Sequence, residues 1–285
     1  MPAHHVVPDG PVSGTALLLH GIGLGAWIWE RDQALLAARG WESWAVTLPG
    51  HGADAGADVG LAEVLDAVNE AIAALGRPAI IGHSMGGLLA QCAAGRAPVH
   101  AAVLVASHPC GEVGMRPTPQ GARSMLPRLP AFLAGRPLRF RLEDYLAAGL
   151  DQLEPERAAA LFARITPWPN RLVRDLARPL KVGRLSCPVL VTHGLLDPLV
   201  SLRSARLLAD HHDAILWRFD DLAHMPPLEP GGARHLQAVA DWLARPRGRK
   251  VTEVDPLQPD EGVGADARAW RRVGGPRSNS RFRRR

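Results

Sequence analysis

The chain has 285 residues, of which 47% are hydrophobic and 21% charged, a composition that suits a globular enzyme with one sizeable core. No run approaches the ~20 apolar residues of a membrane-spanning helix, and residues 1–5 lack the basic and apolar regions of a secretory signal. The formal net charge is +5, and three cysteines (Cys92, Cys110 and Cys187) occur at no recognisable disulfide spacing. We therefore expect a reduced, cytoplasmic protein.

The first predicted elements alternate between strand and helix. Residues 15–19 form an apolar strand that enters a glycine-flanked turn, where a backbone amide can point inward. Residues 34–39 are helical, and residues 44–48 form a second strand. The apolar spacing of residues 61–75 then predicts a helix. The motifs that follow the two strands are His20-Gly21-Ile22-Gly23 and Pro49-Gly50-His51-Gly52.

The most informative motif follows the apolar run of residues 78–81 and has the sequence Gly82-His83-Ser84-Met85-Gly86-Gly87. A helix-like stretch, residues 88–94, comes directly after it. A strand that turns sharply into a helix forces the turn residue into a strained conformation, and small residues two positions on either side leave room for the turn. This geometry exposes the hydroxyl of Ser84, which we predict to be a nucleophile.

Residues 101–106 form another strand, after which the alternation stops between residues 108 and 183. Ten prolines between residues 109 and 179 separate short amphipathic stretches. Such an insertion can act as a lid that covers a site and shapes its pocket. We expect Phe132, Phe140 and Trp168, with Trp27 beside the first turn, to line that pocket. Packing of each of these side chains onto the body is the alternative.

The acid and the base follow the last two predicted strands. Residues 187–194 lead to Asp197, and residues 214–219 lead to a loop that contains His224. Asp220 and Asp221 compete for the role of the acid, but a loop after the preceding strand lets Asp197 reach the far ring nitrogen of the histidine. The order serine, aspartate, histidine is that of the strand-turn-helix hydrolases.

Near-continuous apolar strands that alternate with helices predict an α/β protein with a mostly parallel sheet covered on both faces. With its four motifs in this order, the chain resembles serine-dependent members of the α/β-hydrolase superfamily, of the esterase and lipase type. The resemblance spans residues 15–244. It implies a hydrolase core in residues 1–107 and 184–244 and a helical lid in residues 108–183, inserted before the strand that carries the acid.

The resemblance also implies a mechanism. His224, held by Asp197, removes the proton of Ser84, which attacks an ester-type carbonyl, while the amides of Ile22 and Met85 receive the oxyanion. We favour a carboxylic ester hydrolase for a small, apolar acyl substrate. Acyl transfer, perhydrolysis, and lactone or carbon–carbon bond hydrolysis use the same residues and stay open. A hydrolase-fold ligand receptor with slow turnover is the alternative from another class.

No cofactor and no metal are expected, because the sequence contains no His-Glu-x-x-His, no Cys-x-x-Cys and no dinucleotide-binding glycine pattern. The positive charge belongs to residues 245–285, with 12 Lys/Arg against 5 Asp/Glu, whereas residues 1–244 carry 21 against 23. This basic tail shows no period and few large apolar residues, so we predict that it is disordered. It could contact anionic surfaces, but a solvated extension without a dedicated partner is favoured.

Overall fold

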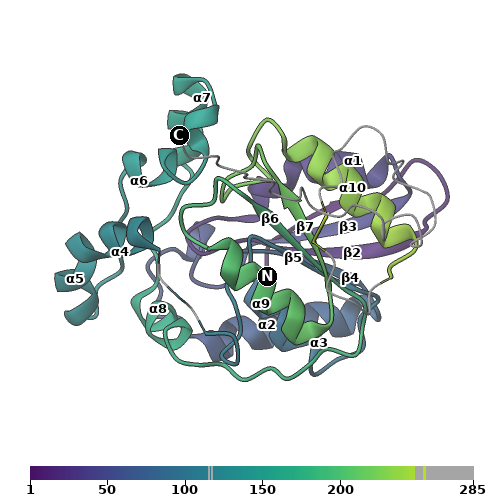
Figure 1. The fold of residues 1–285 in the computed structure, drawn as a ribbon, viewed down its shortest axis with the longest axis horizontal. Coiled ribbons are helices and arrows are strands. Elements are labelled where there is room, and N and C mark those ends of the chain that lie inside the picture. The colour runs from purple at the N-terminus through teal and green to yellow at the C-terminus, as the bar shows by residue number, and fades with distance from the viewer. Residues whose placement is uncertain (115, 117, 248–252, 255–285) are drawn as a thin grey trace, which may run out of the picture.

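The computed structural model describes residues 1–114, 116, 118–247 and 253–254, and these residues build a central sheet of eight strands (Figure 1). The strands lie in the order β1-β3-β2-β4-β5-β6-β7-β8. β1 runs antiparallel to β3, and every other neighbouring pair is parallel. The strands are β1 (Ala3–Val6), β2 (Gly14–Leu19), β3 (Trp41–Val46), β4 (Ala79–His83), β5 (Ala102–Val105), β6 (Val189–Gly194), β7 (Ile215–Phe219) and β8 (Glu253–Val254).

Helices cover both faces of the sheet. α1 and α10 lie on one face, and α2, α3 and α9 lie on the other (Figure 1). These five are α1 (Glu30–Ala37), α2 (Leu61–Leu75), α3 (Met85–Ala94), α9 (Leu202–His212) and α10 (Gly232–Ala244). Single 3₁₀ turns are Ala26–Trp29, Gly52–Asp54, Leu126–Arg128 and Leu150–Gln152. No helix in the described ranges combines the length and apolar character needed to cross a membrane.

The core consists of two layers, one on each side of the sheet. Side chains along a strand alternate between faces, so Ala16 and Leu18 of β2 join the layer under α1 and α10, whereas Leu17 and Leu19 join the layer under α2, α3 and α9. All four are fully buried. Burial on both faces explains why the central strands are continuous apolar runs. The packed strands also hold in place the loops that follow them, which carry the motifs.

Residues between β5 and β6 form a group of short helices at one side of the sheet (Figure 1). Their bounds are α4 (Pro119–Met125), α5 (Leu129–Leu133), α6 (Leu142–Leu146), α7 (Pro155–Phe162) and α8 (Asn170–Leu176). Prolines stand in the first turn of α4, α5 and α7, and none of the five helices exceeds eight residues. A backbone bridge between Leu138 and Trp168 ties the group together.

The predicted mostly parallel sheet with helices on both faces is confirmed, and the helix expected over residues 61–75 is α2. One short strand, Glu253–Val254, was not predicted; it pairs with β7 at the edge of the sheet. The prediction of a disordered tail otherwise concerns residues that lie mainly outside the described ranges, since only 245–247 and 253–254 of that tail are described.

Candidate active site

Ser84 lies at the turn between β4 and α3, with φ 52° and ψ −117°. Residues other than glycine rarely adopt these backbone angles, because they bring the Cβ atom close to the neighbouring backbone. The two glycines around it are required by space: a Cβ on Gly82 would stand 2.2 Å from the carbonyl oxygen of Gly86, and one on Gly86 would stand 2.2 Å from that of Leu19. The glycines therefore permit the turn that the sequence predicted.

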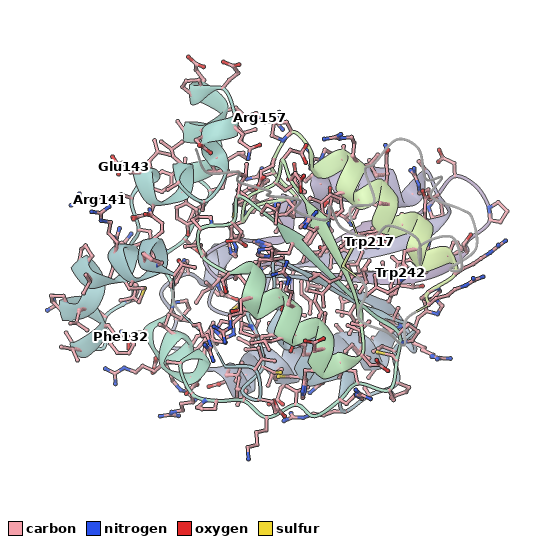
Figure 2. All side chains as sticks on the ribbon, viewed as in Figure 1. Phe132, Arg141, Glu143, Arg157, Trp217 and Trp242 are labelled. Atoms are coloured by element: carbon pink, nitrogen blue, oxygen red, sulfur yellow. The ribbon has the colours of Figure 1, made fainter. Side chains whose placement is uncertain are left out.

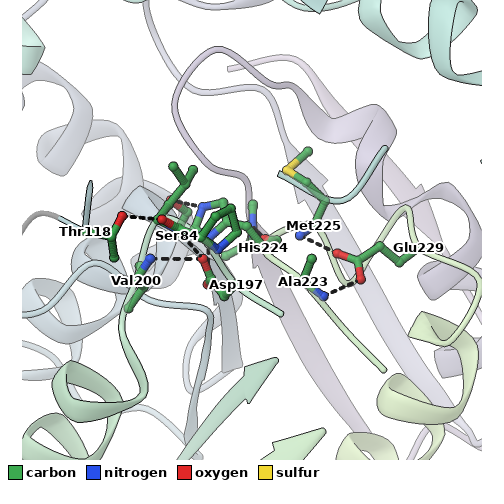
Figure 3. Close-up of polar contacts among 11 residues, drawn as sticks. Ser84, Thr118, Asp197, Val200, Ala223, His224, Met225 and Glu229 are labelled. Carbon is green, nitrogen blue, oxygen red and sulfur yellow. Dashed lines mark hydrogen bonds and ion pairs between the residues drawn. The ribbon is translucent and has the colours of Figure 1, made fainter. Parts of the chain in front are cut away.

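The structure brings Ser84, His224 and Asp197 into one chain of contacts (Figure 3). His224 Nε2 lies 3.1 Å from Ser84 Oγ, and His224 Nδ1 lies 2.8 Å from Asp197 Oδ2. A carboxylate can only accept, so Nδ1 carries the ring proton and Nε2 presents a lone pair to the serine hydroxyl. This is the arrangement in which the histidine can take the proton of Ser84.

Asp197 is the carboxylate that meets His224, and its position is fixed by the backbone. Its Oδ1 accepts hydrogen bonds from the amides of Leu199 (2.8 Å) and Val200 (2.9 Å). The Asp197 side chain is 0% exposed, whereas the side chains of Asp220 and Asp221 are 65% and 45% exposed and pair with arginines. The two competing aspartates therefore face solvent, and Asp197 is the aspartate that contacts His224.

The charges in this contact chain support each other. Burial alone raises the pKa of Asp197, but the charge and hydrogen bond of His224 and the amide of Val200 hold that pKa below its usual value. Burial likewise lowers the pKa of His224, and Asp197 outweighs it, so the net pKa is raised. His83 Nε2 donates to the carbonyl oxygen of His224 at 2.7 Å, and burial lowers the pKa of His83 to about 3, so this neighbour is neutral.

Ile22 and Met85 lie beside Ser84 and line, with it, the cavity described below. Met85 is the first residue of α3, and the first N–H groups of a helix have no acceptor within the helix. His20 supports the opposite turn: its Nδ1 donates to the carbonyl oxygen of Gly21 at 2.7 Å, and its Nε2 accepts from the amide of Leu48 at 3.0 Å. Both amides can therefore face a developing negative charge.

A cavity of about 380 Å³ opens beside Ser84 and His224. The sheet side contributes the residues already described, and the group of short helices contributes the opposite wall. That wall is mostly apolar, with Met125, Phe140, Tyr145, Trp168, Val173 and Leu176. Phe140 and Trp168 pack with ring centroids 4.1 Å apart, and Trp168 Nε1 donates to Tyr145 Oη at 3.2 Å.

Two residues predicted to line the pocket are elsewhere. Phe132 on α5 lies at the outer end of the helical group (Figure 2), where Arg174 stacks over its ring. Trp27 packs against the core layer under α1 and α10, with Arg164 over its outer side. Neither lines the cavity. The prediction was wrong for these two because aromatic character does not reveal which way a short helix turns its side chains.

The group of short helices also contacts the turn of residues 20–23. The amide of Thr166 donates to the carbonyl oxygen of Gly23 at 2.8 Å. Gly23 has φ 79°, and a Cβ there would stand 2.4 Å from Trp168 Nε1. A glycine is thus needed both for the turn and for the close approach of Trp168.

Sequence reasoning missed Glu229, a fully buried carboxylate behind the histidine loop (Figure 3). Its two oxygens accept from the amides of Ala223 and Met225, the residues on either side of His224, each at 2.6 Å. Arg31 supports the same loop by donating to the carbonyl oxygens of Pro226, Pro227 and Glu229. Burial raises the pKa of Glu229 to about 7. The only hint in the sequence is an acid within a proline-rich loop.

Comparison with known proteins gives the family. The chain matches the model of the Alpha/beta hydrolase family over residues 16–242, and it belongs to that family. It is 27% identical over 259 residues to a monoacylglycerol lipase of Mycolicibacterium smegmatis, covering 83% of this chain and 90% of the relative. It is 32% identical over 227 residues to a pimeloyl-[acyl-carrier protein] methyl ester esterase of Chromobacterium violaceum, covering 74% and 87%.

Solved structures agree on the fold. A monoacylglycerol lipase from Paleococcus ferrophilus superposes with a TM-score of 0.68 at 19% identity, covering 87% of this chain and 100% of that one. An esterase from Rhodococcus sp. also gives a TM-score of 0.68, at 22% identity, with coverage of 86% and 95%. The expected α/β-hydrolase fold and the resemblance read from the motifs are thereby confirmed.

Proposed function

We propose that this α/β hydrolase cleaves carboxylic esters of small apolar acyl substrates, with Ser84 as nucleophile, His224 as base and Asp197 as the orienting acid. The observation that carries the proposal is the contact chain from Asp197 through His224 to Ser84, which ends at an apolar cavity. The names of the two sequence relatives, a lipase and a methyl ester esterase, support ester hydrolysis.

The geometry supports each step of acyl transfer. His224 Nε2 takes the proton of Ser84 Oγ as that oxygen attacks the ester carbonyl, and Asp197 stabilises the resulting imidazolium. The carbonyl oxygen becomes negative and accepts from the amides of Ile22 and Met85. The protonated histidine then gives its proton to the leaving alcohol, leaving an acyl-serine. Water, activated by the same histidine, releases the acid and restores Ser84.

Residues 108–183 act as the lid in this proposal, set on a core of residues 1–107 and 184–244. They supply the aromatic wall opposite Ser84, including Phe140 and Trp168, so they would shape the acyl pocket and exclude water. A cavity of about 380 Å³ suits a ligand at the small end of the usual range for binding sites. The substrate class is therefore a short or medium apolar acyl ester.

The test combines a substrate panel with covalent labelling. Wild-type protein should hydrolyse p-nitrophenyl esters in preference to matched amides and lactones, and a fluorophosphonate should label Ser84. Ser84→Ala should lose the label and at least ~10³-fold of turnover. Ser124→Ala is the matched control, because Ser124 lines the same cavity but donates to the carbonyl oxygen of Gly121.

Several results would overturn the proposal. Labelling that persists in Ser84→Ala would reject the nucleophile, and a preference for lactones or amides would reject the bond type. An added alcohol or peroxide that outcompetes water for the acyl-enzyme would indicate a transferase or a perhydrolase. Tight retention of an ester without turnover would indicate a ligand receptor.

A further inference from the structure

A second cluster of chemically reactive side chains lies outside the cavity. Cys110 stands in the loop after β5, and His211 and His212 are the last two residues of α9. One possible ligand atom from each of the three lies within 4.8 Å of the others. Cys110 and His212 are buried, and His211 is partly exposed. None of the three lines the cavity beside Ser84.

The hydrogen bonds of the two histidines fix which nitrogen is free. His211 Nε2 lies 3.0 Å from the carbonyl oxygen of Gly183, which can only accept, so Nε2 carries the proton. His212 Nε2 lies 3.3 Å from Gln91 Oε1. The Gln91 amide is itself oriented, because its nitrogen donates to the carbonyl oxygens of Gly87 and His108. Both rings are therefore held with the lone pair on Nδ1.

The second ring nitrogen of His212, Nδ1, has no hydrogen-bond partner among the described residues. This nitrogen is buried, and the residue as a whole is 3% exposed. A buried polar atom without a partner costs stability, so such atoms are rare and need an explanation. A ligand that accepts an electron pair from Nδ1 would supply one.

We propose that Cys110 Sγ, His211 Nδ1 and His212 Nδ1 bind a zinc ion. One thiolate and two imidazoles form a donor set that zinc prefers, and zinc-bound histidines usually donate their other N–H to a carbonyl or similar acceptor, as both rings do here. In a tetrahedral site the ligand atoms are roughly 3.5 Å apart. The three side chains would therefore close by about 1 Å, a movement that partly exposed His211 can make.

Glu112 supplies negative charge at this site. The negative charge of its carboxylate interacts with both the Cys110 thiol and the His212 ring, and the Glu112 side chain is exposed. It can complete the coordination directly or through water. The positive charge of Arg184 opposes this effect at His212, but the Arg184 guanidinium also pairs with Asp213, with Nη1 3.9 Å from Oδ2. With a thiolate and a carboxylate beside it, a divalent zinc ion would be close to neutralised.

The position of the cluster suggests what the metal would do. Glu112 Oε1 accepts from the amides of Val182 (2.9 Å) and Gly183 (2.8 Å), and His211 binds the carbonyl oxygen of Gly183. Cys110 is near the start of the 108–183 segment, and Gly183 is its last residue. A zinc ion here would fasten both ends of that segment to α9, as a structural metal that takes no part in ester cleavage.

The test uses the full-length protein, freed of metal and titrated with Co²⁺. We expect one Co²⁺ per chain, with a near-ultraviolet band from thiolate-to-cobalt charge transfer, and displacement of Co²⁺ by Zn²⁺. At about 100 times its Kd, Zn²⁺ should raise Tm by roughly 5 °C. Cys110→Ser should remove the band, and His211→Ala should weaken binding at least tenfold.

Matched controls separate the metal site from general damage to the fold. Cys187→Ser replaces a partly buried cysteine outside the cluster, and His5→Ala replaces an exposed histidine, so both should bind Co²⁺ as the wild type does. Cys110 is buried, and its replacement could unfold the loop; His211→Ala, at a partly exposed position, should keep full esterase activity without metal. A wild type without the cobalt band, or a band and Tm rise unchanged in both ligand variants, would overturn the proposal.

Discussion

The two walls of the cavity are held in different ways. On the sheet side, Ser84 is fixed by backbone, because a Cβ on Gly82 or Gly86 would meet a carbonyl oxygen at 2.2 Å. On the other side, short helices present side chains such as Phe140 and Trp168, which pack against each other with ring centroids 4.1 Å apart. Backbone against backbone leaves no room for adjustment, whereas side chains can repack. We therefore expect changes on the sheet side to remove activity, and changes on the helical side to alter substrate preference.

The largest effect should come from Asp197→Asn. The asparagine can accept the amides of Leu199 and Val200 but favours the wrong tautomer of His224, so kcat should fall by about 10⁴-fold while Tm changes little. Steady-state kinetics and thermal unfolding measure the two quantities. Asp220→Asn is the control and should be fully active, because that carboxylate is exposed. Equal losses of kcat in the two variants would show that Asp197 is not the orienting acid.

Gly86→Ala should destabilise the sheet side of the cavity. The new methyl group would overlap the carbonyl of Leu19, so β2 or the turn must move, and we expect a loss of more than about 3 kcal/mol in the free energy of unfolding. Urea denaturation measures it. Gly10→Ala is the control, since a Cβ there meets nothing within 4 Å. A Gly86→Ala protein as stable as the control would show that the turn can relax.

Glu229→Gln should have an intermediate effect on the loop of His224. The amide nitrogen of glutamine would face one of the two N–H groups that the carboxylate accepts, from Ala223 or Met225, and leave it without a partner. We expect kcat to fall ten- to a hundredfold, with KM nearly constant, because the histidine loses its support. Glu154→Gln, an exposed position, controls for charge. A variant with reduced Tm but normal kcat would show that Glu229 stabilises the fold and does not position His224.

Phe140→Ala should alter the helical wall without touching the catalytic contacts. Removing this ring takes apolar surface from the acyl pocket, so the ratio of kcat/KM between neighbouring chain lengths should change by about tenfold, toward longer acyl chains. Phe132→Ala is a matched control, because its ring lies outside the cavity. Identical preference profiles for the two variants would place the acyl chain elsewhere.

The smallest effect concerns pH. His224 must be neutral to act as a base, and Asp197 raises its pKa above the ordinary 6.5, so activity should be present above that raised pKa and lost as pH falls through it. The acid limb of kcat/KM should therefore lie above pH 6.5. Asp197→Asn should move the limb to lower pH, whereas Phe140→Ala should leave it in place. An acid limb near pH 4 in the wild type would contradict the assignment.

The sheet side of the site could be predicted from the sequence, since each motif follows an apolar strand and parallel strands end at one edge. The glycines around Ser84 carry this information locally. Phe140 and Phe132 look alike in sequence, yet only Phe140 lines the cavity, because the orientation of short, proline-interrupted helices depends on tertiary packing. Glu229 and the cluster of Cys110 with two histidines were missed for a related reason. Their partners are backbone amides or residues about a hundred positions away, and no spacing rule reveals them.

The hydrogen bond from Thr166 to Gly23 couples the group of short helices to the turn of residues 20–23. Any movement that lifts Thr166 away from the sheet also removes a bond from the turn that carries Ile22, and it separates Trp168 from Gly23. Opening at this corner would therefore loosen the turn of residues 20–23. At α4, the N-cap residue Thr118 donates to the carbonyl oxygen of Pro198, in the loop whose amides hold Asp197, so movement at that end would disturb Asp197 and leave the turn of residues 20–23 intact.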